Sequence, residues 1–306
     1  MKCLVFAYSQ LGHDCLRYLV EHTSYSIAAV VTHDDNPIEH IWFDSAKDYA
    51  KAHNIPVFTP LTLNDSTIQA QLAVIDADVI LSFYYRHMIP EAVLAMQRLG
   101  AYNMHGSLLP KYRGRCPVNW AIIHGESETG VTLHHMVKAA DAGDIVDQAS
   151  TVIMADDTAG TVTKRLNMLA VDVLARNIDL IAERKAPRHC QKADEATYFG
   201  GRKPADGAID WSWSAQRIHN LIRALQPSPQ YPPAFGVLND MFYTFWKSEH
   251  VTPEYVDREC VDNIVANEPR SEAMPGVLIK TREPGIFYVS CGENGQETII
   301  VYATST

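Results

Sequence analysis

Residues 2–32 read KCLVFAYSQLGHDCLRYLVEHTSYSIAAVVT, and this stretch decides the fold. The unbroken apolar run Lys2–Ala7 predicts a buried strand, Leu11–Glu21 repeats apolar residues at helical spacing, and Ser26–Thr32 predicts a second strand. Parallel strands need a crossover connection, which is usually a helix. A strand, a helix and a strand in this order therefore predict the first unit of a parallel sheet.

The same alternation continues up to residue 105. Short apolar runs and segments with helical spacing follow one another, and Pro90 suits the first turn of a helix. The pattern predicts an α/β fold with a mostly parallel, Rossmann-like sheet and helices on both faces. We expect helices over Trp42–His53, Thr67–Ile75 and Pro90–Arg98, and extended segments over Pro56–Thr59, Asp78–Phe83 and Ala101–His105.

The composition changes past Pro187, where this alternation ends. Before that point, Gly130–His135 and Val146–Met154 are strand-like. Asp157-Thr158 can then cap a long helix whose apolar residues follow one face. An amphipathic stripe of this kind indicates packing against a core, so we assign this helix to the α/β domain.

The last third of the chain predicts a second, β-rich domain. A helix near Ala215–Leu225 precedes a Pro-rich stretch at 227–233, and an acidic stretch at 249–272 predicts a solvated loop. The strand-like segments are Met241–Trp246, Gly276–Lys280, Ile286–Cys291 and Thr298–Tyr302. A chain of 306 residues suits two domains. We place the α/β domain in residues 1–188, and a linker helix with a small OB-like β domain in residues 189–306.

Composition excludes several classes of partner. The chain is 47% hydrophobic and 20% charged, as in a globular protein, and its formal net charge of −10 opposes a broad nucleic-acid surface. No apolar run approaches the roughly 18 residues of a membrane helix, and the first residues lack the features of a signal peptide. We therefore expect a cytoplasmic protein with no membrane span and no nucleic-acid partner.

Residue spacing argues against a metal and against a dinucleotide. The six cysteines form no C-x-x-C pair, no H-E-x-x-H occurs, and the adjacent His134 and His135 point to opposite faces of a strand. The turn at residues 8–13 has one glycine, Gly12, where a dinucleotide fingerprint has three. We predict no metal and no NAD, and Gly12 fits either a tight turn or a ligand contact.

An amide and an imidazole lie at the end of one predicted strand, and three cations follow shortly after it. Residues 103–115 read NMHGSLLPKYRGR, and strand alternation places Asn103 and His105 on the same side. Asp141 follows 38 residues after Asn103. Each residue alone has an ordinary explanation, as a turn former, a buried polar side chain or a loop cap. Together with their flanking motifs they predict one reaction site.

These motifs resemble those of the 10-formyltetrahydrofolate-dependent formyltransferases, which include the methionyl-tRNA, glycinamide ribonucleotide and sugar-nucleotide N-formyltransferases. The resemblance rests on residues 103–114 (N-x-H-G-S-L-L-P-K-Y-R-G), 126–133 (E-x-E-T-G-V-T-L) and 141–145 (D-A-G-D-I). It extends from residue 1 to about 245 and is weak in the last sixty residues. Residues 82–87 (SFYYRH) and 113–120 (RGRCPVNW) most resemble the formyltransferase half of the bifunctional polymyxin-resistance enzymes, which act on UDP-4-amino-4-deoxy-L-arabinose in lipid A modification.

The resemblance implies catalytic roles for Asn103, His105 and Asp141. An amine attacks the formyl carbon carried on N10 of the folate, and Asn103 donates an amide N–H to the tetrahedral oxyanion. His105 takes the proton from the attacking nitrogen and delivers it to the departing folate nitrogen. The Asp141 carboxylate is expected to orient the ring of His105 and to raise its pKa by favouring the imidazolium.

The resemblance also implies residues that bind the two substrates. The cosubstrate is 10-formyltetrahydrofolate, with neither a metal nor NAD, and its pocket would use His87, Met88, Ile89, Arg115, Val137, Lys138, Ala139, Ala140 and Asp141. Two or three local cations can neutralise a diphosphate. The candidates are Lys111, Arg115 and Arg202. Arg115 also fits an ordinary loop-anchoring role.

Charge favours a small acceptor over tRNA. A polyanion needs basic surface along loops and the second domain. Residues 31–60, however, carry five acidic residues against two lysines, and residues 201–306 carry thirteen Asp and Glu against nine Lys and Arg. We therefore predict a nucleotide-linked amino sugar. UDP-4-amino-4-deoxy-L-arabinose follows from the resemblance alone, and dTDP- or GDP-linked amino hexoses and methionyl-tRNA stay open as alternatives.

Two alternatives of a different class also stay open. Cys116 could act as a nucleophilic thiol, because the neighbouring Arg113 and Arg115 favour a thiolate. The chain could also be a binding module for a folate or nucleotide sugar without catalysis. The sequence leaves open the oligomeric state and whether the chain is free-standing or half of a bifunctional protein.

Overall fold

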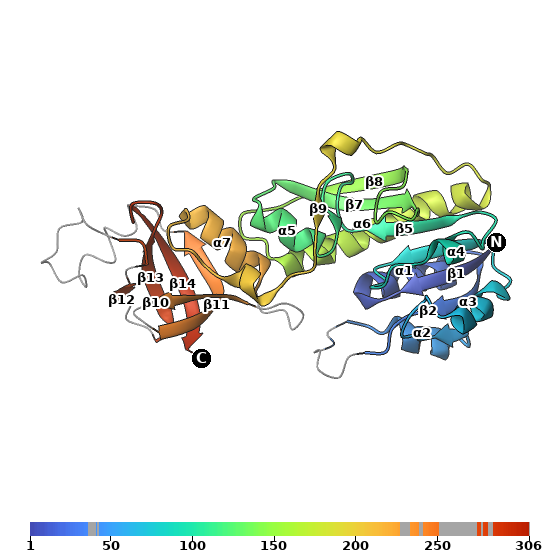
Figure 1. Cartoon of the computed structure of the whole chain (residues 1–306), viewed down its shortest axis with the longest axis horizontal. Helices are drawn as coiled ribbons and strands as arrows, with labels where there is room; N and C mark the ends of the chain where they lie inside the picture. The colour runs from blue at the N-terminus through green and yellow to red at the C-terminus, as the bar shows by residue number, and fades with distance from the viewer. Residues whose placement is uncertain are drawn as a thin grey trace, which may run out of the picture. The chain divides into compact units, whose positions relative to one another are not determined.

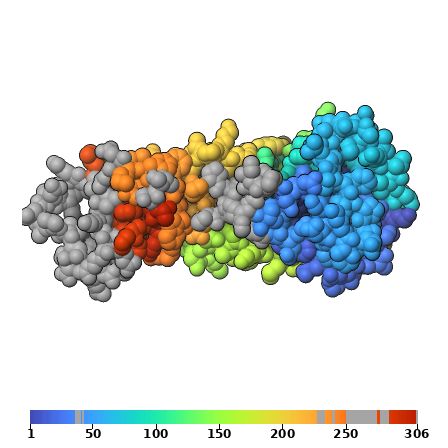
Figure 2. All heavy atoms as spheres, turned by 90° about the horizontal axis from the view of Figure 1, so that it is seen from below, coloured from blue at the N-terminus to red at the C-terminus, as the bar shows by residue number. Residues whose placement is uncertain are grey.

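A computed structural model describes residues 1–35, 41, 43–226, 233–238, 241–250, 274–276, 278–280 and 284–305, and the other residues are grey in Figures 1 and 2. Most of the predicted Pro-rich and acidic loops, residues 227–232 and 251–272, lies outside these ranges. The chain divides into two compact units. Unit 1 comprises Met1–Pro117, Glu128–Val152 and Thr163–Gly200, and unit 2 comprises Val118–Ser127, Ile153–Val162 and Gly201–Thr306.

Unit 1 is built on a seven-stranded sheet in the order β3-β2-β1-β4-β5-β7-β8 (Figure 1). Neighbours from β3 to β5 pair in parallel, whereas β7 and β8 run antiparallel to their neighbours. The predicted mostly parallel sheet is confirmed. Its strands are β1 (Lys2–Ala7), β2 (Ser26–Val31), β3 (Val57–Phe58), β4 (Val79–Phe83), β5 (Ala101–His105), β7 (Glu128–His135) and β8 (Ile145–Val152), and β6 (Arg113–Gly114) pairs separately with β9 (Tyr198–Phe199).

The strand order reverses between β1 and β4. The chain adds β2 and β3 on one side of β1 and then returns to its other side with β4 and β5. Every residue of β1 from Cys3 to Ala7 is buried, so both faces of the sheet are covered there. Burying one side chain such as Leu4 or Phe6 contributes about 1.5–3 kcal/mol. Open α/β sheets bind ligands beyond the carboxyl ends of their strands near such a reversal.

The helices of unit 1 follow the predicted pattern with shifted ends. The predicted helix from Trp42 begins at Ala46, because the Ser45 hydroxyl caps it. The predicted helix to Arg98 is a single turn, because the Leu99 N–H bonds to the Asp78 carbonyl (2.9 Å) and returns the chain to the sheet. The helices are α1 (Ser9–His22), α2 (Ala46–Ala52), α3 (Ser66–Ala73), α4 (Glu91–Leu94), η1 (Ala193–Glu195) and the part of α6 (Ala159–Ala182) from residue 163 onward.

Gly12 lies at a close approach of α1 to the sheet. A Cβ on Gly12 would lie 3.1 Å from the Phe83 carbonyl oxygen and 3.1 Å from the Ala7 carbonyl carbon, which is tighter than ordinary side-chain packing. The glycine therefore lets the first turn of α1 pack directly on the ends of β1 and β4. This contact accounts for Gly12 without any ligand.

Unit 2 contains a five-stranded antiparallel sheet in the order β10-β11-β14-β13-β12, which confirms the predicted β-rich second domain. Helix α7 buries Ile218, Leu221 and Ile222 and packs on β11 and β14. None of the described helices is long and apolar enough to cross a membrane. The elements are α5 (Pro117–Ile123), η2 (Pro204–Gly207), α7 (Ala215–Ala224), β10 (Ala234–Leu238), β11 (Met241–His250), β12 (Leu278–Lys280), β13 (Ile286–Cys291) and β14 (Glu297–Ser305).

Candidate active site

The three residues predicted to be catalytic lie together in unit 1. Asn103 and His105 are on β5, and Asp141 is on the loop that joins β7 to β8. Asp141 Oδ1 lies 3.4 Å from Asn103 Nδ2 and 3.6 Å from His105 Nδ1. Because alternate residues of a strand point to one face, β5 presents both side chains to the same carboxylate. A site that begins on β5 is thus completed by a loop from the neighbouring strands.

Two glycines allow the Asp141 loop to lie this close to its neighbours. The Gly114 N–H donates to Asp141 Oδ2 (2.8 Å). Gly114 has a φ of 98°, and a Cβ there would overlap the Phe199 carbonyl oxygen. A Cβ on Gly143 would overlap the His135 carbonyl oxygen. Only glycine fits these two backbone contacts, so both positions serve the geometry of the loop.

The imidazole of His105 is held in one tautomer. Its Nε2 lies 2.8 Å from the Tyr112 carbonyl oxygen, and a carbonyl only accepts hydrogen bonds, so Nε2 carries the hydrogen. In the neutral ring Nδ1 therefore has a free lone pair, which faces Asp141. The Asp141 carboxylate raises the pKa of His105, as predicted, but the pKa is not raised overall. Burial lowers the pKa below its ordinary value and outweighs the opposite effect of Asp141, so the ring is neutral near pH 7.

Asp141 is ionised in this setting. Burial alone would raise the pKa of its carboxyl, but the imidazoles of His105 and His134 and the Gly114 N–H outweigh burial and hold the pKa well below its usual range. A neutral imidazole therefore faces a carboxylate. This arrangement leaves the ring ready to accept a proton and stabilises the imidazolium once it forms.

His134 is a member of the cluster that the sequence did not identify. Its Nδ1 donates to the His135 carbonyl oxygen (2.9 Å), so in the neutral ring Nε2 is an acceptor. This atom lies 3.2 Å from Asn103 Nδ2 and 3.5 Å from Asp141 Oδ1. With the 3.4 Å between Asn103 and Asp141, the three atoms form a nearly equilateral triangle. Seen from Asn103 Nδ2, the angle between the two acceptors is smaller than the angle between the two N–H bonds of an amide. Both acceptors can therefore share one hydrogen, which leaves the other Asn103 N–H free.

The residues predicted to bind folate after β4 differ in exposure. The side chain of Met88 is 61% exposed, whereas Ile89 is 5% exposed and belongs to the hydrophobic core of unit 1. A role for Ile89 in binding is therefore limited to its main chain. The ring of His87 lies with its edge against His33 (centroids 4.5 Å apart) and the ring of Tyr85 (5.8 Å).

The other predicted binding residues lie in three places. Val137 is 44% exposed, and Lys138 Nζ lies 3.9 Å from Glu91 Oε2, so the first part of the Asp141 loop is open to solvent. Lys111 and Arg115 are exposed residues of unit 1. Ala139 and Ala140 lie between Lys138 and Asp141 on this loop. Arg202 belongs to unit 2, where its guanidinium lies over the Trp120 ring and 3.5 Å from Asp206.

A cluster of aromatic and imidazole rings lies where the strand order reverses. His33 follows β2 and stacks on Tyr85, which follows β4 (centroids 4.3 Å apart). Burial is the main cause that lowers the pKa of His33 to about 4, so its Nε2 accepts the Arg86 N–H (3.0 Å) as a neutral ring. His33 therefore holds the segment that the resemblance assigns to the folate pocket. Nothing in the sequence pointed to this contact, because the partners are 53 residues apart.

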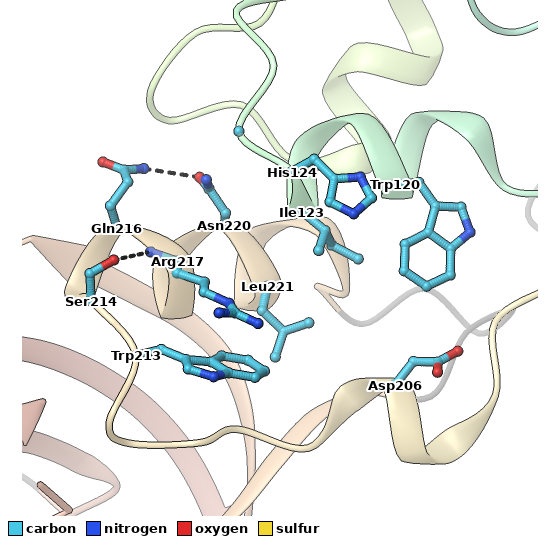
Figure 3. A pocket seen from close by; sticks show the side chains of 11 residues that line it. Trp120, Ile123, His124, Asp206, Trp213, Ser214, Gln216, Arg217, Asn220 and Leu221 are labelled. Carbon is cyan, nitrogen blue, oxygen red and sulfur yellow. Dashed lines mark hydrogen bonds between the residues drawn. The ribbon is translucent and has the colours of Figure 1, made fainter. Parts of the chain in front are cut away.

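The hollow drawn in Figure 3 lies in unit 2 and contains none of the predicted catalytic residues. Its volume is about 580 Å³. The Arg217 guanidinium lies over the Trp213 ring, 3.8 Å from its centre, and Trp120 and His124 line the side formed by α5.

Within the ranges that the structure describes, no group of three or more His, Cys, Asp or Glu side chains is arranged to hold a metal ion.

Comparison with known proteins identifies the family. The family model described as Formyl transferase matches residues 1–178, and the model described as Formyl transferase, C-terminal domain, matches residues 202–301. Among solved structures, the N-formyltransferase from Helicobacter canadensis in complex with folinic acid and dTDP-3-aminofucose is 20% identical, covers 99% of both chains and has a TM-score of 0.72.

Two further structures share the fold. WlaRD, a sugar 3N-formyl transferase in the presence of dTDP and 5-N-formyl-THF, is 20% identical over 100% of this chain and 98% of its own, with a TM-score of 0.71. Methionyl-tRNA formyltransferase from Clostridium thermocellum is 18% identical over 82% of this chain and 93% of its own, with a TM-score of 0.56. With the first family model covering more than half of its residues, the chain belongs to the formyl transferase family.

Proposed function

We propose that this chain transfers the formyl group of 10-formyltetrahydrofolate to the amine of a nucleotide-linked amino sugar. The observation that carries the proposal is the cluster of Asn103, His105 and Asp141 in a member of the formyl transferase family. Two structural relatives support the choice of ligands: one contains folinic acid with dTDP-3-aminofucose, and the other was determined in the presence of dTDP and 5-N-formyl-THF.

His105 supplies the base. With Nε2 donating to the Tyr112 carbonyl, Nδ1 is the ring atom that can accept the proton of the attacking amine. The lowered pKa keeps Nδ1 unprotonated near pH 7. After the transfer, the imidazolium lies 3.6 Å from Asp141. At an effective dielectric constant of about 20, two unit charges at such a separation attract by on the order of 4 kcal/mol.

Asn103 stabilises the charge that develops on oxygen. The amine nitrogen bonds to the formyl carbon, the carbonyl electrons move to oxygen, and the free N–H of Asn103 donates to that oxyanion. The bond between the formyl carbon and the folate nitrogen then breaks as His105 returns its proton to that nitrogen. The products are a formamide on the sugar and tetrahydrofolate, with no net change in protons.

In this proposal the folate binds beside the catalytic cluster. We assign its pocket to His87, Met88, Ile89, Arg115 and the loop 137–141, as the resemblance implies. The stack of His33 on Tyr85 supports the first three positions, because it fixes the backbone that leads into them. At Ile89 the contact would be made by the main chain, since its side chain is part of the core.

For the acceptor we propose UDP-4-amino-4-deoxy-L-arabinose, the sugar of the lipid A modification that confers polymyxin resistance. The motifs at residues 82–87 and 113–120 support this sugar over other amino-sugar nucleotides. Lys111 and Arg115, both exposed residues of unit 1, are the cations proposed for the diphosphate. The acidic balance of residues 201–306, nine basic against thirteen acidic, supports a small anion over tRNA.

A substrate panel tests the proposal. The purified chain is incubated with 10-formyltetrahydrofolate and, separately, with UDP-4-amino-4-deoxy-L-arabinose, dTDP- and GDP-linked amino hexoses, and methionyl-tRNA. Mass spectrometry is expected to detect a formyl group on the UDP-linked pentose. Formylation of a dTDP- or GDP-sugar alone would overturn the acceptor but keep the reaction class. Formylation of methionyl-tRNA alone, or of no acceptor, would overturn the proposal of a sugar N-formyltransferase.

A further inference from the structure

The loop that carries Asp141 is held by hydrogen bonds from a buried glutamine. Gln191 lies beyond the end of α6 and is 9% exposed. Its Nε2 donates to the carbonyl oxygens of Asp141 (2.8 Å) and Gly143 (2.6 Å). Both amide hydrogens are thus used on two carbonyls of one short loop, so Gln191 closes the loop like a clamp.

A buried arginine fixes the orientation of this amide. Arg113 is 6% exposed, and its Nε and Nη2 donate to Gln191 Oε1 at 3.0 and 2.6 Å. An amide turned by 180° would place its NH₂ group against these donors, so the observed orientation is the only one that satisfies both sides. Arg113 Nη1 donates to the Tyr198 hydroxyl (2.6 Å). With its nitrogens engaged and buried, Arg113 supports the clamp and is not positioned as a cation for the substrate.

The hydrogen bonds of Gln191 support a residue in a rare backbone conformation. Asp141 has a φ of 51°, in the left-handed region that non-glycine residues rarely adopt, so its conformation needs support from neighbouring contacts. Gln191 holds its main chain, while the next residue after Arg113, Gly114, holds its carboxylate through a main-chain N–H. The side chain and the backbone of the segment 113–114 therefore both fix Asp141.

We propose that Gln191 is a positioning residue for formyl transfer, which holds the main chain of Asp141 so that its carboxylate stays beside His105 and Asn103. This inference rests on the proposed function for its catalytic meaning. Gln191 does not reach the reacting atoms, and its effect is transmitted through Asp141. A displacement of about 1 Å in such a group can lower a rate on the order of 10²-fold.

Two substitutions distinguish the hydrogen bonds of Gln191 to the loop carbonyls from its hydrogen bonds to Arg113. Gln191→Glu keeps the size of the side chain and the acceptor for Arg113 but places an oxygen against the two loop carbonyls, so both donors are lost. Gln191→Met removes all the hydrogen bonds and leaves Arg113 without this partner, which carries a risk of misfolding. Asn177→Leu is the matched control, because Asn177 is also a buried amide whose Nδ2 donates twice, to Asp147 Oδ2 (2.6 Å) and to the Val173 carbonyl (2.8 Å).

The readouts are kcat and KM for the acceptor, the melting temperature, and hydrogen exchange at the Gly114 amide. Gln191→Glu is expected to lower kcat on the order of 10²-fold, with KM for the acceptor unchanged and with loss of protection at the Gly114 amide. Asn177→Leu is expected to lower the melting temperature but to leave kcat and that amide unchanged.

Three outcomes would overturn the inference. The first is an unchanged kcat in Gln191→Glu with the Gly114 amide still protected. The second is a loss of kcat in Asn177→Leu equal to that in Gln191→Glu, which would indicate a general effect of stability. If the wild type formylates no acceptor, the proposed function fails, and only hydrogen exchange at the Gly114 amide can then test whether Gln191 holds Asp141. In that case the third outcome is retained protection of this amide in Gln191→Glu.

Discussion

Strands β5 and β7 each place one buried histidine against Asp141, and the two rings face it in opposite ways. His105 on β5 turns Nδ1 to Asp141 Oδ1 (3.6 Å), and His134 on β7 turns Nε2 to the same oxygen (3.5 Å). In each ring the other nitrogen donates to a backbone carbonyl. In the neutral ring of His134, Nε2 accepts from Asn103, whereas His105 Nδ1 has no such donor among the interactions described above. The role of each histidine thus depends on which of its ring nitrogens donates to a backbone carbonyl.

Removal of the proposed base is expected to have the largest effect. His105→Ala should lower kcat on the order of 10²–10⁴-fold, because no other group in the cluster offers a free lone pair at that position. Steady-state kinetics with 10-formyltetrahydrofolate measure it, and His53→Ala, at an exposed histidine, is the control. Full activity in His105→Ala together with loss of activity in Cys116→Ala would replace this mechanism with a thiol nucleophile.

Removal of the proposed oxyanion donor is expected to have the second largest effect. Asn103→Ala should lower kcat by roughly 10²–10³-fold, since the proposed hydrogen bond strengthens only as the oxyanion forms. Folate affinity, measured by equilibrium titration, should stay unchanged. Asn64→Ala, at an exposed asparagine, provides the comparison. A defect confined to folate binding would contradict the role assigned to Asn103.

Neutralising the shared carboxylate should move the pH dependence. In the proposed mechanism His105 acts as the neutral base, so activity should be lost as the pH falls through its pKa. Burial lowers this pKa and Asp141 raises it, so Asp141→Asn lowers it further and shifts the acid limb of kcat/KM to lower pH. The same substitution should reduce kcat, because the imidazolium loses its counter-charge. A pH profile that does not move would rule out the coupling between Asp141 and His105.

The smallest effect is expected on β7. His134→Phe removes the acceptor for Asn103 but leaves His105 and its Tyr112 contact in place, so kcat should fall by about tenfold through misorientation of the amide. His134→Gln can restore an acceptor and should recover part of the loss. If His134→Phe proved as damaging as His105→Ala, the distinction drawn between the two strands would be wrong.

Much of the fold could be predicted because its signals are local. The run Lys2–Ala7 and the helical spacing of Leu11–Glu21 are visible in neighbouring residues, and the structure has a strand and a helix there. Ends of elements were less predictable. The helix predicted to Arg98 ends at Leu94, because Leu99 bonds to a residue 21 positions away. Such a bond has no signature within the segment itself.

The site divides in the same way. Asn103, His105 and Asp141 could be named from the motifs that surround them, but His134 and Gln191 could not. His134 pairs with Asn103 across an antiparallel ladder, and Gln191 reaches Asp141 from 50 residues further along the chain. The effect of Asp141 on the pKa of His105 was predicted correctly, but the larger opposite effect of burial was missed, because the spacing of residues does not reveal how deeply a ring is buried.

The sequence by itself determined the alternation of elements, the residues of the candidate site and the acidic balance that disfavours a polyanion, because these depend on residue type and on short-range spacing. Only the tertiary structure decided which nitrogen of each imidazole is free, which carbonyls Gln191 binds, and why Gly114 and Gly143 must lack a side chain. These properties arise where distant segments meet at hydrogen-bonding distance, and burial there sets the charge of each group.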